Sequence, residues 1–381
     1  MKKAFYLMVA VALMVSCTQG EVLVDTENQT TEVVRSIGFN TFVEKATRAT
    51  GTNSTALHDF YSTFYVYGWK TVGNDVTCVF ENIPVEFFAD DMAGQVVYTQ
   101  GKPSDEWTFE AGSWYYQNIR YWDKMASSYQ FCAFTPASVG VAFECLPSGV
   151  ITIGTANAPV TVDTKNLMAT PATALAYTGF DRDYMTATAT DVVGNVSLNF
   201  SHLQAKFNIK INLDESIETA QDVSVQKIEV HNLGDKAYYE SDATNAAGTV
   251  SGWTLGTASD DYVLSTPAVY SLNNANTNYN GYYVLEQLII PQTVENVSGN
   301  DLVSLVEYAE ACVYVEYKIG GETFKCYTPL ANIFSKNSTD DYTFEGGNQY
   351  TLNITVGPDP IKFEAEVTAW SAENTGDQEM D

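Results

Sequence analysis

Strict alternation of apolar and polar residues is the feature that most constrains the fold of this chain. Between residues 203 and 213 every second residue is apolar and every intervening residue is Gln, Lys or Asn; the apolar set is Leu203, Ala205, Phe207, Ile209, Ile211 and Leu213. Side chains of a β-strand point alternately to opposite faces, so this stretch is predicted to be a strand with one apolar face. Helical periodicity is almost absent elsewhere, and the sequence therefore predicts an all-β protein.

The alternation changes phase just before this strand. In the stretch VSLNF the apolar residues are Val196, Leu198 and Phe200, so the phase reverses across Ser201 and His202. A strand cannot exchange its two faces without an irregularity. The sequence predicts a β-bulge or a bend there, with His202 as a structural residue that bonds the irregular backbone.

Further short strands are expected throughout the chain. They fall at residues 64–69, 76–80, 106–110, 129–134, 350–356 and 361–369. Many short strands separated by turn residues are typical of antiparallel β-sandwiches, and 381 residues fit two domains better than one. A Thr- and Ala-rich stretch, residues 169–191, lacks a strong strand pattern, so we expect the domains to divide at residues 49–185 and 186–381.

The first seventeen residues have the pattern of a targeting signal. Lys2 and Lys3 precede an apolar stretch, residues 4–15, that is too short for a permanent membrane span, and the stretch closes on Ser16 and Cys17. A small residue before a Cys at this place resembles the bacterial lipoprotein signal, in which the Cys is lipidated. We expect residues 1–17 to be this signal and Cys17 to be the lipidation site; the alternative is an ordinary signal peptide with an incidental Cys.

Residues 33–43 also have a strand pattern. One face carries mostly apolar residues, namely Val33, Ile37, Phe39 and Val43, with Arg35 and Thr41 in the same phase. The small, polar segment that follows contains Arg48-Ala49, a sequence that a trypsin-like protease would cut. We expect residues 18–48 to be a removable strand and linker, with cleavage between Arg48 and Ala49.

The charge balance excludes several classes of partner. The chain has 19 basic and 47 acidic residues, a net charge of −28. Binding to nucleic acid or to an anionic membrane surface requires clustered Lys and Arg, so neither is expected. A strongly acidic surface suits a soluble, exported protein.

The sequence offers little catalytic chemistry. It contains no HExxH, GxSxG, P-loop or GxGxxG motif, and its three histidines, His58, His202 and His231, are far apart. Paired carboxylates could bind calcium or hydrolyse glycosides, but in so acidic a chain they fit solvated turns better. These pairs are Asp90-Asp91, Asp181/Asp183, Asp260-Asp261 and Asp340-Asp341. We expect no catalytic residue, metal ligand or cofactor.

The strand register of one predicted hairpin indicates whether two of the cysteines can form a disulfide. CVYVEYKIGGETFKCY reads as a hairpin that turns at Gly320-Gly321 and pairs Val315 with Cys326, which places Cys312 and Cys326 on opposite faces. These two should not bond. With Cys17 set aside, five of the six cysteines remain, and an odd number without a CxxC makes a poor disulfide framework. Each is expected to be a buried, small apolar residue: Cys78, Cys132, Cys145, Cys312 and Cys326.

Two aromatic runs allow a second interpretation. Residues 114–122 and 279–284 could be platforms for stacking glycans, although aromatic residues at this frequency fit strands and packed contacts better. A monomeric surface lipoprotein that binds glycans therefore stays open as an alternative; it would retain lipidated Cys17 and residues 18–48.

Several stretches occur in the order seen in the fimbrillin family, the lipoprotein subunits of the type V pili of Bacteroidales. In the second half they are VSLNFSHLQAKFNIKI, LEQLIIPQT, FEGGNQYTLNITV and IKFEAEVTAW; in the first half FYVYGW and RYWDKMASSYQFCAFTP are similar. The likeness covers nearly the whole chain after the signal.

The resemblance implies a fold and a mode of assembly. It implies two transthyretin-like β-sandwich domains in tandem, export as an outer-membrane lipoprotein, and cleavage by an arginine-specific surface protease, a role that Arg48-Ala49 would fill. Loss of the first strand would open a groove that a strand of the next subunit fills, building a head-to-tail filament.

One departure from the family concerns the donated strand. Shaft subunits commonly donate a C-terminal strand, whereas this chain ends in the polar SAENTGDQEMD after Trp370. Either the donor lies in residues 361–370, or the subunit has a tip or anchor role.

Overall fold

The protein is built almost wholly of β-strands. The computed structural model describes residues 36–43, 62–88, 112–135, 143–161, 185–190, 195–217, 222–242, 249–256, 262–265, 269–272, 282–296, 311–335, 340–357 and 361–369. A single short helix, α1 (Leu330–Phe334), lies within these ranges. The all-β prediction is confirmed. Within the same ranges, no helix has the length and the apolar character that crossing a membrane requires.

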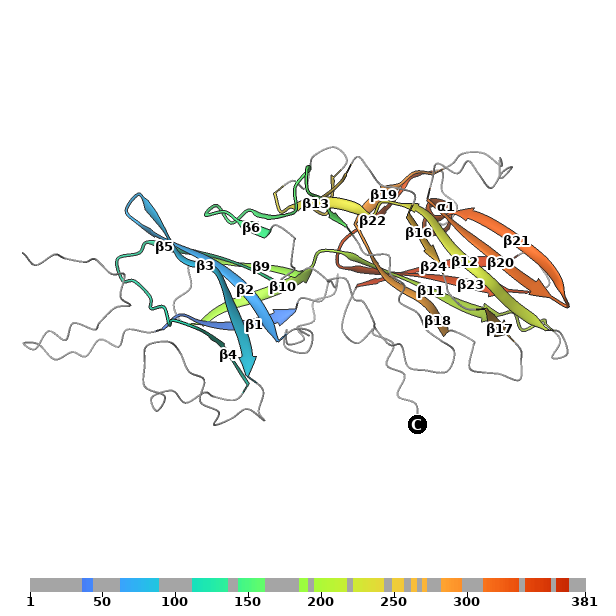
Figure 1. Ribbon diagram of the computed structural model, residues 1–381, viewed down its shortest axis with the longest axis horizontal. Helices are drawn as coiled ribbons and strands as arrows, with labels where there is room; N and C mark the ends of the chain where they lie inside the picture. The colour runs from blue at the N-terminus through green and yellow to red at the C-terminus, as the bar shows by residue number, and fades with distance from the viewer. Residues whose placement is uncertain are drawn as a thin grey trace, which may run out of the picture.

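A seven-stranded sheet gathers the N-terminal strands at one end of the molecule (Figure 1). Its strands, in spatial order, are β1 (Gly38–Val43), β10 (Asn195–His202), β9 (Met185–Thr190), β5 (Ser128–Thr135), β2 (Thr63–Val72), β3 (Asp75–Phe88) and β4 (Ser113–Tyr116). All neighbours are antiparallel except β1 and β10, which run parallel.

Two sheets occupy the other end of the molecule. The four-stranded sheet has the order β18 (Tyr282–Ile289), β11 (Ala205–Leu213), β23 (Asn348–Val356) and β24 (Lys362–Ala369). The five-stranded sheet consists of β16 (Tyr262–Ser265), β12 (Val223–Leu233), β20 (Cys312–Ile319) and β21 (Glu322–Pro329), with β17 (Tyr270–Leu272) also paired to β12. One hydrophobic core takes residues from both sheets and from α1.

Smaller sheets complete the fold. The six-stranded sheet contains β14 (Thr249–Val250), β15 (Trp253–Leu255), β13 (Lys236–Glu240), β7 (Ile151–Ile153), β6 (Phe143–Cys145) and β8 (Val160–Thr161). Strands β19 (Gln292–Val294) and β22 (Tyr342–Phe344) form a two-stranded sheet. Because the six-stranded sheet takes strands from both halves of the sequence, it joins the two ends of the molecule.

The phase reversal before residue 203 is a passage between sheets. Strand β10 ends at His202 in the seven-stranded sheet, and β11 begins at Ala205 in the four-stranded sheet. The connecting Leu203 is buried, and its carbonyl oxygen accepts a hydrogen bond of 2.8 Å from the indole nitrogen of Trp253. Faces reverse here because the chain changes its packing partners.

The stretch 169–191 contains a strand that the sequence did not indicate. Strand β9 spans Met185–Thr190 and pairs with β5 and β10 in the seven-stranded sheet. Its sequence, MTATAT, alternates threonine with Met185 and two alanines, so a search for repeated large apolar residues overlooks it. Strand β9 spans the expected domain boundary and β10 follows it in sequence, but both lie in the sheet of the N-terminal strands.

The hairpin around Gly320-Gly321 has the predicted register. The observed pairs include Ile319 with Glu322, Tyr317 with Phe324, and Val315 with Cys326. Both glycines have positive φ, +58° and +90°, which a two-residue turn of this kind requires. As predicted, Cys312 and Cys326 are not bonded to each other.

The prediction that all five of these cysteines are buried, unbonded residues was wrong for four of them. Cys132 of β5 and Cys145 of β6 form a disulfide, with their Cα atoms 6.5 Å apart. Cys78 is exposed and Cys326 half-buried, so among the described cysteines Cys312 alone is buried outside a disulfide, as was expected. The disulfide joins strands of two different sheets, a proximity that spacing along the chain does not indicate.

Candidate functional site: the first strand and its groove

Strand β1 and the residues just before it contact both ends of the seven-stranded sheet. Its backbone pairs with β10, and the segment before it meets the far end of the sheet: the amide of Ile37 donates to the carbonyl of Arg120 at 2.8 Å. The hydroxyl of Tyr116, at the end of β4, donates to the carbonyl of Ile37 at 2.6 Å. Burial raises the pKa of Tyr116 to about 12, so this donor keeps its proton at neutral pH. The first strand is thus paired along β10, and the residue before it is anchored to Tyr116 and Arg120 at the far end of the sheet.

The predicted apolar face of this strand points into the core. Ile37, Phe39 and Thr41 are all buried, whereas Asn40 is exposed. Val33 and Arg35 lie outside the described residues, and the structure describes only the backbone of Val43. For the residues that the structure describes, the predicted facing of this strand is confirmed.

Phe39 is the centre of an aromatic cluster. The centroid of its ring lies 5.5 to 6.1 Å from the centroids of four other rings, in edge-to-face orientations. These rings belong to four different strands: Phe64 of β2, Phe80 of β3, Tyr116 of β4 and Phe131 of β5. Without β1, these rings and the adjacent face of β10 would line an open groove. We call this set, Phe64, Phe80, Tyr116, Phe131, Val196 and Leu198, the β1 groove.

Two positions of β1 fit their surroundings imperfectly. The hydroxyl of Thr41 is buried and has no hydrogen-bond partner, which is an energetic penalty in an apolar core. A Cβ at Gly38 would lie 2.4 Å from the side-chain oxygen of Asn195, so glycine permits the present orientation of that asparagine. Neither feature prevents β1 from packing beside β10, but both make its packing less favourable than that of an ideal strand.

The structure shows where the first strand ends and the segment with the predicted cleavage site begins. Strand β1 ends at Val43, opposite Phe200 in the register of β10. Arg48, Ala49 and Cys17 themselves lie outside the described residues, so the predicted cleavage and lipidation sites stay predictions.

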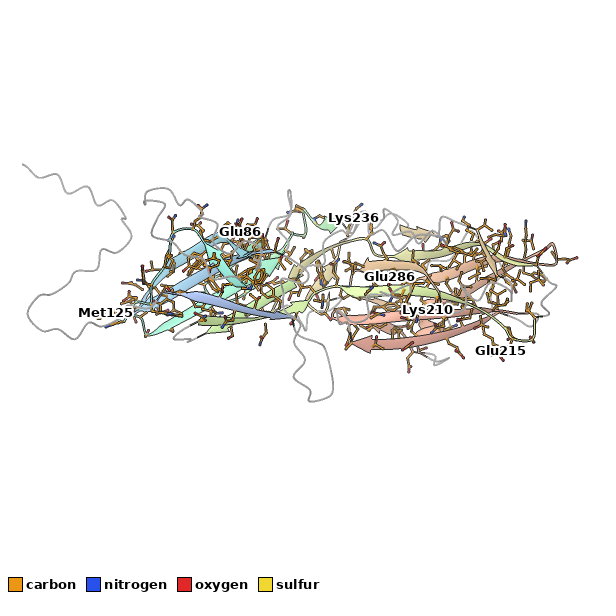
Figure 2. The ribbon with its side chains drawn as sticks, turned by 90° about the horizontal axis from the view of Figure 1, so that it is seen from below. Glu86, Met125, Lys210, Glu215, Lys236 and Glu286 are labelled. Carbon is orange, nitrogen blue, oxygen red and sulfur yellow. A yellow bond between two sulfur atoms is a disulfide. The ribbon has the colours of Figure 1, made fainter. Side chains whose placement is uncertain are left out.

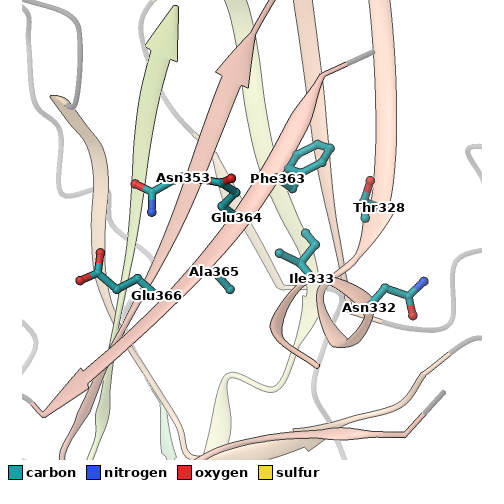
Figure 3. A pocket seen from close by; sticks show the side chains of 8 residues that line it. All are labelled: Thr328, Asn332, Ile333, Asn353, Phe363, Glu364, Ala365 and Glu366. Atoms are coloured by element: carbon teal, nitrogen blue, oxygen red, sulfur yellow. The ribbon is translucent and has the colours of Figure 1, made fainter. Parts of the chain in front are cut away.

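A second candidate lies at the free edge of the four-stranded sheet. Strand β24 pairs with β23 and is the last strand of its sheet, and every one of its residues is half-buried or exposed. A cavity of about 670 Å³ lies between β24 and the segment around α1, lined by Thr328, Asn332, Ile333, Asn353, Phe363, Glu364, Ala365 and Glu366. Phe363 and Ile333 lie on one side of the strand and Glu366 on the other (Figure 3). The last strand is therefore loosely packed on its apolar face.

The remaining candidate residues form no reactive constellation in the part of the chain that the structure describes. There, no group of three or more His, Cys, Asp or Glu is placed to hold a metal ion. His202 is buried, and His231 lies 3.2 Å from the carboxylate of Glu229 on the same strand. Asp341 accepts a hydrogen bond of 2.9 Å from the amide of Asn296, a structural contact between loops. His58 and the other acidic pairs are outside the described residues.

The aromatic run of residues 114–122 mostly packs inward. Trp114 lies 4.9 Å from Phe64 and Trp122 lies 4.7 Å from Tyr129, both against the N-terminal core. Tyr121 is the exception, at 44% exposed. The sequence had identified this run as a packed contact or a platform but had not indicated that Tyr116 and Arg120 would hold the first strand.

Comparisons with known proteins agree with this architecture. The sequence profile of the fimbrillin-like family matches residues 47–370. A fimbrial protein from Bacteroides vulgatus has a similar fold: TM-score 0.53, with 16% identity over 88% of this chain and 100% of that one. A search of curated proteins found no match.

Two further solved structures are more distant. A candidate cell adhesion protein from Bacteroides ovatus is 14% identical over 90% of this chain and 100% of its own, with a TM-score of 0.47. The tip fimbrial protein Mfa3 from Porphyromonas gingivalis, with a C-terminal truncation, is 10% identical over 81% and 94%, with a TM-score of 0.39. The family profile spans most of the sequence, and on that ground the chain belongs to the fimbrillin-like family.

Proposed function

We propose that this chain is a structural subunit of a surface pilus that polymerises by strand exchange after its first strand is removed. The observation that carries the proposal is the position of β1. A strand next to a protease-sensitive sequence contributes the central ring of an aromatic core, so its removal would leave an apolar groove beside an unpaired strand.

Such a groove would bind an extended segment strongly. The freed edge of β10 would offer unpaired N–H and C=O groups, and the vacated space would offer aromatic surface to alternate side chains. A strand supplied by a second subunit satisfies both. Because the contact is head-to-tail and leaves each new subunit with an empty groove of its own, it grows a filament.

The proposed precursor is an outer-membrane lipoprotein anchored through Cys17. An arginine-specific surface protease would cut between Arg48 and Ala49, releasing residues 18–48 together with the anchor. On this account β1 is a placeholder: it completes the core during export and prevents assembly before the surface is reached. The mature subunit then belongs to an extracellular fimbrium that supports adhesion, in two transthyretin-like sandwich domains.

The role within the pilus depends on whether the chain donates a strand. A shaft subunit must both accept and donate, whereas a subunit at the tip or the anchor needs only one of these interactions. A donor within residues 361–370 would make the chain a shaft subunit.

Replacing Arg48 by alanine tests the proposal. The variant should fold and reach the surface but retain residues 18–48 and form no filaments. Lys45→Ala is the matched control, since it removes the other basic residue of the same linker and should leave cleavage and assembly unchanged. Normal filaments from Arg48→Ala cells would refute processing at this site.

A further inference from the structure

Three polar side chains are buried on the face of the four-stranded sheet that is turned away from its hydrophobic core. Lys206 and Asn208 of β11 are 3% and 0% exposed, and Glu286 of β18 is 1% exposed. Lys and Glu are seldom buried to this degree, because removing their charges from water is costly. Both polar atoms of the Asn208 amide, Oδ1 and Nδ2, lack a hydrogen-bond partner among the described residues. Buried polar atoms without partners require an explanation.

The strand register brings the three functional groups together. Lys206 and Asn208 are alternate residues of β11, so their side chains share a face and their Cα atoms are about 6.6 Å apart. In the pairing with β18, Glu286 lies opposite Asn208, whereas Leu288 lies opposite Lys206. Yet Nζ of Lys206 is 3.2 Å from Oε1 of Glu286. The lysine side chain therefore runs along the strand toward Asn208, and its amine contacts the carboxylate that faces the carboxamide.

From this arrangement we infer that Lys206 and Asn208 join through an internal amide bond, with Glu286 as the proton carrier. The amine of Lys206 is the nucleophile and the carboxamide of Asn208 is the acceptor. The methylene chain of lysine spans the distance between the two residues. All reacting atoms belong to this chain, so the modification is autocatalytic, and it is independent of the proposed role in a pilus.

The reaction balances within the cluster. A proton first passes from Nζ of Lys206 to Oε1 of Glu286, which leaves a neutral amine and a carboxylic acid. Nζ then attacks Cγ of Asn208 while the acid protonates Oδ1, and the carboxylate takes a proton from the attacking nitrogen. Glu286 next protonates Nδ2, which departs as ammonia, and it recovers the proton of Oδ1 as the carbonyl forms again. The net change converts an amine and a carboxamide into a secondary amide and ammonia.

The site supplies what this slow reaction requires. Holding the amine beside the carboxamide replaces an encounter in solution, and well-oriented groups reach effective molarities of about 10⁵ to 10⁸ M. Transfer of one proton from the lysine to the glutamate removes both charges from a site closed to solvent, which offsets their desolvation. A positioned carboxyl group that gives and takes protons lowers the barrier further. Release of ammonia into solvent then makes the condensation irreversible.

The same strand contains a matched pair that should not react. Lys210 and Asn212 have the same spacing and lie on the same face as the buried pair, but both are half-buried. Nζ of Lys210 lies 4.3 Å from the centroid of the Tyr283 ring, and Tyr283 is the residue opposite it on β18. Figure 2 shows Lys210 next along the sheet from Glu286. At this position the facing residue offers the amine an aromatic ring in place of a carboxylate.

Trypsin digestion of the denatured full-length chain, followed by mass spectrometry, tests the inference. Trypsin cuts after a free lysine, so an unmodified chain gives residues 183–206 and residues 207–210 as separate peptides. An amide on Nζ of Lys206 blocks the cut at that residue and leaves the cut after Lys210. The expected product is a single peptide, residues 183–210, lighter than its sequence by one molecule of ammonia.

Other products would each overturn the inference. Complete cleavage after Lys206 with no loss of mass would mean that its amine is free. A loss of ammonia with complete cleavage after Lys206 would indicate a succinimide at an asparagine instead. A peptide that is joined to the one containing Glu286 and is lighter by one water molecule would identify a lysine–glutamate amide.

Substitutions assign the reacting groups. Asn208→Ala removes the acceptor and Glu286→Gln removes the proton carrier, so each should restore cleavage after Lys206 and the full mass of both peptides. Asn212→Ala is the matched control on the same strand and should keep the blocked peptide. A blocked peptide from either of the first two variants would refute the role given to the residue it replaces. If Glu286→Gln does not fold, the wild-type digest and Asn208→Ala still decide the inference.

Discussion

Replacing Phe39 by alanine should destabilise the precursor and leave the assembled filament unchanged. The residue lies before Arg48, so processing removes it, and a filament contains no Phe39 on this account. A core mutation that affects only one stage of the life of a protein is an unusual outcome, and it isolates the placeholder role of β1.

The size of the effect follows from the packing of the ring. Phe39 is 4% exposed and contacts four rings at 5.5 to 6.1 Å. Truncating a buried Phe to Ala costs about 3 to 5 kcal/mol, a range that includes the lost edge-to-face contacts. A loss of about 4 kcal/mol lowers the ratio of folded to unfolded precursor by about 1,000-fold. With a urea m-value of about 2 kcal/mol/M, the unfolding midpoint of the N-terminal sheet should fall by about 2 M.

The assay is urea unfolding of the precursor, kept intact by Arg48→Ala and followed by tryptophan fluorescence. Trp114 and Trp122 pack against this core and report its unfolding. Asn40→Ala, which truncates an exposed side chain of the same strand, is the control and should shift the midpoint little. Filaments from processed Phe39→Ala and wild-type subunits should dissociate at the same urea concentration. Easier dissociation of the Phe39→Ala filaments would mean that β1 remains in them, and would refute the reasoning.

Further predictions concern the disulfide, the Tyr116 hydroxyl and the buried ion pair of the four-stranded sheet. Removing the disulfide with Cys132→Ser/Cys145→Ser should lower the free energy of unfolding by about 3 kcal/mol, the loop-entropy value for its separation of 13 residues, measured by chemical denaturation against Cys326→Ser. Tyr116→Phe should weaken the binding of a synthetic first-strand peptide to processed subunits about fivefold, a loss of about 1 kcal/mol. In the wild type, burial raises the pKa of Tyr116 to about 12, so the stability it contributes should decline as pH rises from about 10 toward 12, a phase that Tyr116→Phe lacks in alkaline titration. Lys206→Met should cost about 3 to 5 kcal/mol because it strands the buried carboxylate of Glu286, 3.2 Å away, and Lys206→Met/Glu286→Leu should recover most of that loss in thermal melts.

The sequence predicted those parts of the fold that local chemistry determines. The alternation of apolar and polar residues predicted the strands that the structure shows as β2, β5, β10, β11, β23 and β24. The register of the hairpin at Gly320-Gly321 also followed from sequence, because a two-residue glycine turn permits one pairing and the charges of Glu316 and Lys325 agree with it. The inward face of the first strand was predicted for the same reason.

Contacts between distant segments could not be predicted this way. The disulfide of Cys132 and Cys145 depends on two sheets meeting, and no spacing rule specifies that meeting. Alternation correctly placed Lys206 and Asn208 on the face of β11 opposite its apolar residues, yet both are buried. Whether a polar face is covered depends on tertiary packing. The aromatic groove is a similar case, since its rings come from strands that are remote in sequence.

The most direct test of the account is the intact mass and N-terminal sequence of the protein sheared from the cell surface. The account predicts a chain that begins at Ala49, recovered in high-mass assemblies that resist dissociation. A chain that still begins at lipidated Cys17 and retains residues 18–48 would contradict it, and would instead indicate an anchor or a monomeric binding lipoprotein.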